Sequence, residues 1–143
     1  LLMSPRDFRA RVKPWLAKMI TLAHSYGAKA FHHDDGSIRP LIPDLLEIGI
    51  DVLNPIQWRC KGMDRAALAR DFGRQVVFHG GIDNQQTLPF ETRGEVRCQV
   101  AENIRLFKDG KGHIVAPCHN IQANTPTANI VAMYQAVEEF GQL

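Results

Sequence analysis

Long apolar runs, blocks of like charge and paired cysteines are all missing from this sequence of 143 residues. No apolar run approaches the roughly 20 residues of a membrane-spanning helix, and no signal peptide is evident, so no membrane association is expected. The 17 basic and 15 acidic residues are interspersed, which argues against a nucleic-acid-binding surface. Cys60, Cys98 and Cys118 are widely spaced, which is typical of free thiols and predicts a cytoplasmic location.

The composition is that of a packed globular domain. Hydrophobic residues make up 45% of the chain and charged residues 22%, so a hydrophobic core is expected and disorder is not. The chain opens with Leu1-Leu-Met3 and enters a helical pattern almost at once. We therefore expect that it continues an upstream segment of the same polypeptide.

Helical and strand-like patterns alternate along the chain. Apolar residues at spacings of three and four predict helices over residues 6–26, 38–48, 64–72, 93–108 and 126–140. Short apolar runs predict strands over residues 28–32, 50–54, 75–79 and 113–117. Pro14 is expected to kink or divide the first helix, and residues 80–92 are expected to form a polar loop.

This alternation predicts an α/β fold with a parallel sheet and right-handed crossovers. An open doubly wound sheet and half of a (β/α)8 TIM barrel both fit it. No glycine-rich dinucleotide-binding turn follows any strand, which favours the barrel. We therefore predict that residues 1–143 are the C-terminal half of one barrel domain. Its partner would be the N-terminal half, and alone it would aggregate or form a homodimer through its open edges.

Polar and ionisable side chains follow every predicted strand. In parallel α/β folds, ligands bind at the C-terminal ends of the strands, so we expect these side chains to surround one site. The four segments are His33-Asp-Asp-Gly36, Asn54-Pro-Ile-Gln57, His79-Gly-Gly-Ile-Asp83 and Pro117-Cys-His-Asn120.

His33 and Asp35 are the first candidates for chemistry. They lie two residues apart, so on an extended backbone both side chains point to the same side. They could bind a metal or act as a general acid/base pair, whereas the structural alternative is that Asp34 or Asp35 caps the next helix. His119 is expected to face the same central space as His33, and His32 to face away from it.

The remaining candidates would bind substrate. Asn54 and Gln57 are neutral hydrogen-bonding groups that suit ligand orientation. Gly81 would let the backbone approach a ligand closely, and Asp83 and Gln86 leave the strand end toward the substrate. For two further residues we favour a structural role. Cys118 is expected to be a small buried hydrophobic side chain rather than a ligand or nucleophile. His79 is expected to be a strand histidine with its hydrogen bonds satisfied rather than a site residue.

Taken together, the motifs over residues 28–136 resemble the uroporphyrinogen decarboxylase superfamily, which includes corrinoid- and coenzyme-M-type methyltransferases. The resemblance covers the C-terminal half of that barrel. The motifs that carry it are His33-x-Asp35-Gly36, Leu53-Asn-Pro-Ile-Gln57, His79-Gly-Gly-Ile-Asp83 and His119-Asn-Ile-Gln122, followed by Pro126 and Asn129-Ile130.

The methyltransferase branch binds zinc through a His-x-Cys motif and a late cysteine. His33 matches the histidine, Asp35 stands in place of the first cysteine and His119 in place of the second. The resemblance thus implies zinc or another divalent metal at these three residues, and methyl transfer with a methyl-corrinoid as co-substrate. The partner would be a corrinoid protein or a small-molecule methyl acceptor. This sequence has neither cysteine of that motif, so it departs from the pattern by which the methyltransferases activate a thiol.

Two other functions stay open. The decarboxylase branch acts without a metal on uroporphyrinogen, an acidic tetrapyrrole of porphyrin biosynthesis. Its carboxylates require cations, and the four loops offer only Arg39, Arg59 and Lys61, which argues against this activity. The third alternative is a non-catalytic module that binds a corrinoid or tetrapyrrole.

Overall fold

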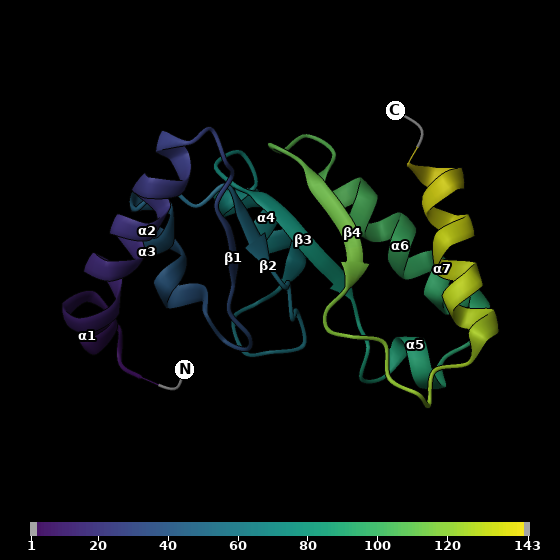
Figure 1. Ribbon diagram of the computed structural model, residues 1–143. Coiled ribbons are helices and arrows are strands. Elements are labelled where there is room, and N and C mark those ends of the chain that lie inside the picture. Colours follow the sequence, from purple (N-terminus) through teal and green to yellow (C-terminus); the bar gives the residue numbers. More distant parts are fainter. Residues whose placement is uncertain (1–2, 142–143) are drawn as a thin grey trace.

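The computed structural model describes residues 3–141, which form a four-stranded sheet covered by helices (Figure 1). The strands are β1 (Phe31–His33), β2 (Val52–Asn54), β3 (Val77–Ile82) and β4 (His113–Pro117). The helices are α1 (Pro5–Asp7), α2 (Lys13–Ser25), α3 (Ile42–Glu47), α4 (Arg65–Phe72), α5 (Thr87–Phe90), α6 (Arg93–Phe107) and α7 (Thr127–Phe140). A π-helical segment, Phe8–Val12, precedes α2, and a 3₁₀ turn, Arg39–Leu41, precedes α3.

All neighbouring strands are parallel, and their spatial order is β1-β2-β3-β4. A doubly wound sheet reverses its strand order at a switch point, whereas consecutive strands of a (β/α)8 barrel stay in sequence order. The observed order therefore confirms the predicted half of a TIM barrel.

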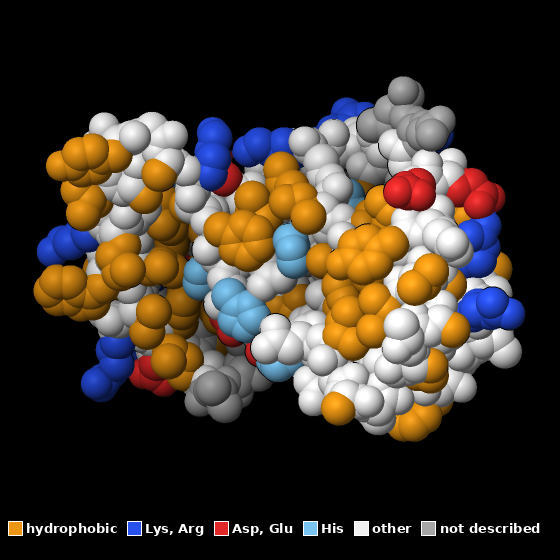
Figure 2. All heavy atoms as spheres, turned by 45° about the vertical axis from the view of Figure 1, so that its right-hand side comes forward, with side chains coloured by type: hydrophobic (Ala, Val, Ile, Leu, Met, Phe, Trp, Pro, Cys, Tyr) orange, Lys and Arg blue, Asp and Glu red, His pale blue; other side chains and the backbone are white. Residues whose placement is uncertain are grey.

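The helices pack on one face of the sheet, and the other face is open among the described residues. Leu53 and Phe78 point toward the helices and are fully buried, with the Phe78 ring 5.2 Å from that of Phe107 in α6. On the opposite face Phe31 is 52% exposed and Ile114 is 44% exposed. Figure 2 shows hydrophobic and histidine side chains next to one another over the middle of the molecule. This open face corresponds to the interior of a barrel.

The N-terminal helical region runs without a break from Pro5 to Ser25, but its hydrogen bonding changes to a π-helical pattern just before Pro14, which fits the predicted kink better than a division. The π-helical turn ends at Val12 and α2 begins at Lys13, which places Pro14 in the first turn of α2. Helical residues precede Pro14, so the N–H that it lacks is missing from a continuous helix, and a π-helical turn is one of the irregularities by which helices accommodate such a position. Of the residues in α2 only Ile20 is buried. Within residues 3–141 no helix has the length and apolar character needed to cross a membrane.

The predicted loop over residues 80–92 is wrong in two places. Strand β3 continues through both glycines to Ile82, because Gly80 pairs with Val115 and Ile82 with Pro117 of β4. A short helix, α5, then occupies Thr87–Phe90. The first strand also starts later than predicted, at Phe31, and includes His33.

Candidate functional site

His33 and Asp35 lie side by side at the C-terminal end of β1. His33 Nε2 is 3.3 Å from Asp35 Oδ2, and the two side chains are 57% and 47% exposed. Neither Asp34 nor Asp35 caps a helix in the described chain, because the 3₁₀ turn and α3 start later and have no side-chain cap. The two-residue spacing thus brings an imidazole and a carboxylate together, as the sequence predicts.

Asn54 joins His33 to His79. In the parallel register His33 is opposite Asn54, and its Nδ1–H donates to Asn54 Oδ1 over 2.6 Å. The amide nitrogen of Asn54 donates in turn to His79 Nδ1 over 2.5 Å. Because Nδ1 of His33 holds its proton in this bond, Nε2, which faces Asp35, is the nitrogen that gains or loses one.

The two imidazoles have opposite electrostatic preferences. The hydrogen bond to Asn54, supported by the nearby carboxylate of Asp35, raises the pKa of His33 despite its partial burial. Burial lowers the pKa of His79, which favours its neutral form. Such a separation between neighbouring titratable groups is typical of sites that move protons. The two histidines and the Asn54 that joins them lie on the three adjacent strands β1, β2 and β3.

A cavity of about 470 Å³ lies over these residues. His33, Asn54 and His79 form part of its wall, and His119, from the loop after β4, lines it as well. Within residues 3–141 no group of three or more His, Cys, Asp or Glu side chains is assembled closely enough to hold a metal ion. The structure therefore offers His33 and Asp35 as one adjacent pair of donors, with His119 elsewhere on the cavity wall.

Cys118 and His32 also lie in this region, one buried beside the cavity and the other on the far side of β1. Cys118 is buried, its Sγ donates to the carbonyl oxygen of Ile56 over 3.0 Å, and burial raises the pKa of its thiol to about 12. Its burial agrees with the expected small buried side chain, and the raised pKa disfavours the thiolate that a nucleophilic cysteine needs. His32 points away from the cavity, toward the apolar contacts between α2 and the sheet.

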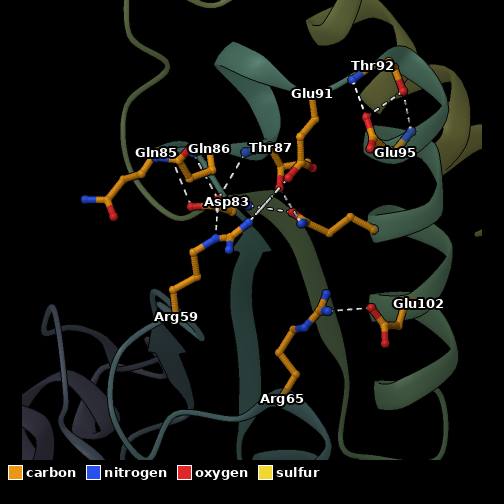
Figure 3. Close-up of polar contacts among 11 residues, drawn as sticks. Arg59, Arg65, Asp83, Gln85, Gln86, Thr87, Glu91, Thr92, Glu95 and Glu102 are labelled. Carbon is orange, nitrogen blue, oxygen red and sulfur yellow. Dashed lines mark hydrogen bonds and ion pairs between the residues drawn. The ribbon is translucent and has the colours of Figure 1, made fainter.

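Asp83 organises the turn from β3 into α5 (Figure 3). It is only 4% exposed, and its carboxylate accepts hydrogen bonds from the backbone N–H groups of Gln85, Gln86 and Thr87. Arg59 donates to it through Nε over 2.6 Å. Burial alone would raise the pKa of Asp83, but these hydrogen bonds and the Arg59 charge lower it. Asp83 thus fixes Arg59 and the turn, and its contact with substrate stays a prediction.

Of the other predicted substrate residues, Asn54, Gln57 and Gln86 line the cavities, whereas Gly81 lines neither of them. Gln57 accepts a hydrogen bond from the backbone N–H of Gly36 over 2.6 Å, which ties the loops after β1 and β2 together. Gly81 has φ +91°, and a Cβ placed there would lie 2.8 Å from Asn103 Nδ2. The space at Gly81 is therefore taken by α6.

A second cavity, of about 550 Å³, adjoins the first at His119. Gln57 and Gln86 line it, together with residues that the sequence analysis does not single out. The signal that could have found them is the density of amides in two loops, Asn84-Gln-Gln86 and Asn120-Ile-Gln-Ala-Asn124. The additional lining residues are Asn84, Gln85, Gln122 and Asn124.

Comparisons with known proteins agree on one family. The family model for uroporphyrinogen decarboxylase (URO-D) matches residues 1–140. A uroporphyrinogen decarboxylase from Thermus thermophilus is 25% identical over 142 residues, and one from Nocardioides sp. is 26% identical over 138 residues. Each alignment covers 96% of this chain and 38% of the relative. A methyltransferase from Methanosarcina mazei has the same fold, with a TM-score of 0.78, 23% identity, and coverage of 97% of this chain and 38% of that one.

Proposed function

The chain belongs to the uroporphyrinogen decarboxylase family, and on that premise we propose that it forms the C-terminal part of a barrel enzyme that transfers a methyl group with a corrinoid. The reaction would take place at His33, Asp35 and His119. The chain spans 38% of the length of the relatives that it matches, so the rest of the barrel would complete the site.

The observation that carries this proposal is the arrangement around His33. Asn54 engages Nδ1, so that Nε2 is directed to Asp35 at the edge of the cavity. An imidazole oriented in this way can hold a metal through Nε2 or exchange a proton there with a bound substrate. Asp35 would stabilise the charged imidazole or serve as a second ligand, and His119 would act from another part of the wall.

His33, Asp35 and His119 carry the types of donor that suit zinc or another divalent metal, although within residues 3–141 only His33 and Asp35 lie side by side. All three would be ligands in this proposal, with His119 brought up to the pair, and the side-chain oxygen of Asn54 is the kind of outer partner that fixes the ring of a metal-binding histidine. A bound divalent cation would lower the pKa of a coordinated acceptor group and so make it a better nucleophile. In this proposal Gln57 and Gln86 orient the substrate, and Asp83 positions Arg59 and the turn beside it, whereas Gly81 serves the packing of β3 against α6.

Decarboxylation of an acidic tetrapyrrole is the second candidate, because the curated relatives are uroporphyrinogen decarboxylases. In that reaction the histidines would handle protons without a metal. Carboxylates of the substrate would need available cations, yet two of the three that the loops offer are already engaged. Arg39 pairs with Asp71, and Arg59 pairs with Asp83 and Glu91. Their pairing favours a less anionic ligand and therefore methyl transfer.

Metal content is the first test. We expect about one zinc or other divalent ion per chain in the intact protein, and its loss in both His33→Ala and His119→Ala. His24→Ala is the matched control, since His24 belongs to α2 and pairs with Asp51. The measurement is elemental analysis, combined with assays of methyl transfer from methylcobinamide and of CO2 release from uroporphyrinogen. Absence of metal from all the proteins, with CO2 release, would refute the metal site and establish the decarboxylase instead.

A further inference from the structure

Two buried amide side chains hold the segment that runs from the end of β3 through α5. We call this segment, residues 83–91, the α5 segment. Gln99 of α6 is 9% exposed and Asn129 of α7 is 5% exposed, and neither lines the two cavities of the site. A buried amide loses its hydration and must recover hydrogen bonds from protein groups. For both residues these bonds fall on the α5 segment.

Gln99 closes the turn from β3 into α5. The last pair between β3 and β4 is Ile82 with Pro117, so the next backbone N–H, that of Asp83, lies beyond the sheet. Gln99 Oε1 accepts from this N–H over 2.7 Å, and Gln99 Nε2 donates to Thr87 Oγ1 over 2.8 Å. Thr87 is fully buried, and its own N–H donates to the Asp83 carboxylate over 3.1 Å. One amide thus binds the turn at two points that are four residues apart.

Asn129 binds the other end of the α5 segment. Carbonyl groups near the end of a helix have no partner within it, and α5 has only four residues. Asn129 Nδ2 donates to the carbonyl oxygens of Leu88 and Glu91, over 2.9 Å in each case. Since α6 and α7 pack against each other, the α5 segment is fastened at both ends to one pair of helices.

The α5 segment forms part of the wall of the site. Asp83 accepts the 2.6 Å hydrogen bond from Arg59 Nε, and Arg59 Nη2 lies 3.5 Å from Thr87 Oγ1, the hydroxyl that Gln99 also binds (Figure 3). The Arg59 ion pair therefore shares its support with the turn. Three residues of the segment line the cavity of about 550 Å³: Asn84, Gln85 and Gln86.

We propose that Gln99 and Asn129 are positioning residues, which set the place of the α5 segment from outside the site and thereby the affinity of the cavity wall for substrate. This inference rests on the proposed function, in which Gln86 orients the substrate. Both residues act through the wall, and His33 and Asp35 belong to β1 and the loop that follows it. Loss of either amide should therefore raise KM and leave kcat nearly unchanged.

The variants Gln99→Met and Asn129→Leu remove the amides and keep side chains of similar size. KM and kcat of the intact protein are measured with methylcobinamide and with uroporphyrinogen. We expect KM to rise about five- to tenfold in each variant, as lost buried hydrogen bonds predict, and kcat to stay within about twofold. Phe107→Leu is the control for stability, because Phe107 is buried in the same helix as Gln99 but packs on Phe78. It should lower the unfolding temperature without changing KM.

A double-mutant cycle with Gln86→Ala tests whether Gln99 acts through the wall. If Gln99 positions Gln86, the effect of Gln99→Met on KM should be about threefold smaller when Gln86 is already alanine. A general loss of stability would instead give independent effects, whose fold-changes multiply. Multiplying effects, or a KM that Gln99→Met leaves unchanged, would overturn the inference.

Hydrogen exchange tests the position of the α5 segment without reference to any activity. Relative to the amides of β3 in the same protein, those of residues 83–91 should exchange at least about tenfold faster in Gln99→Met and Asn129→Leu. The ratio should stay unchanged in Phe107→Leu, and unchanged exchange in both amide variants would overturn the inference. In a wild-type protein that turns over neither compound the proposed function fails, and the exchange ratio then decides the inference by itself.

Discussion

At the scale of single residues, the contacts of the site arise in two ways, from the spacing of residues along one segment of the chain and from the register between strands. The His33–Asp35 contact follows from a spacing of two on one extended segment. The bridge from His33 through Asn54 to His79 depends on the register between three strands, which no local pattern contains. Asp83 is bound by Arg59 and by backbone N–H groups of the turn into α5. These partners also depend on tertiary structure, so the sequence alone did not predict them.

Asp51 provides a prediction at this scale. Its carboxylate accepts from the backbone N–H of Ala30 over 2.9 Å and contacts His24 and Lys29, so it joins α2 to the start of the sheet. These bonds, the one from Ala30 foremost, lower the pKa of Asp51 to about 2. A carboxylate with a folded pKa below its unfolded value of about 3.9 adds stability above that value and loses it as the pH falls.

We expect Asp51→Asn to lower the free energy of unfolding at pH 7 by about 1–2 kcal/mol, allowing for the partial exposure of the side chain. The difference from wild type should vanish as the pH falls from about 4 to about 2. Urea denaturation over this pH range measures it, with Asp109→Asn on an exposed turn as the control. A difference that did not change with pH would show that the lost stability is not due to the charge.

At the scale of elements, the alternation of helices and strands was predictable because apolar periodicity records which face each element buries. The residues at which the elements begin and end were harder to predict. Gly80 and Gly81 predict a break in β3, since glycine weakens strands, but pairing with β4 extends the strand through both. Glycine is needed at Gly81 for a tertiary reason, the close approach of Asn103 from α6, which the sequence of β3 does not show.

Replacement of Gly81 by alanine tests this approach. Its positive φ would strain an alanine, and the new Cβ would collide with Asn103, whose Oδ1 is held by Arg65 over 2.6 Å. We expect Gly81→Ala to destabilise the protein by about 2–4 kcal/mol. Gly27→Ala is the matched control, because φ there is +73° but nothing lies within 4 Å of the added Cβ, so the cost should be about 1 kcal/mol. Equal losses in thermal unfolding of the two variants would mean that Asn103 does not restrict this position.

At the scale of the whole molecule, the described chain has the sheet of half a barrel with both of its outer strands open. β1 and β4 each pair with one neighbour only among residues 3–141. The face that a barrel would enclose carries exposed Phe31 and Ile114 next to the histidines of the site. Open edges and exposed apolar side chains favour association with further strands, which the remainder of the barrel would supply in the relatives.

The isolated chain of residues 1–143 should therefore self-associate at micromolar concentration, as analytical ultracentrifugation would show. Ile114→Lys places a charge on the open face of edge strand β4. It should shift the distribution toward smaller species, because association would bury the charged lysine. Val131→Lys replaces an apolar side chain of similar exposure on α7, away from the sheet, and should leave association unchanged. A compact, stable wild-type monomer would contradict this view. The helices would then suffice to stabilise the half-barrel, and neither its edges nor its inner face would require a partner.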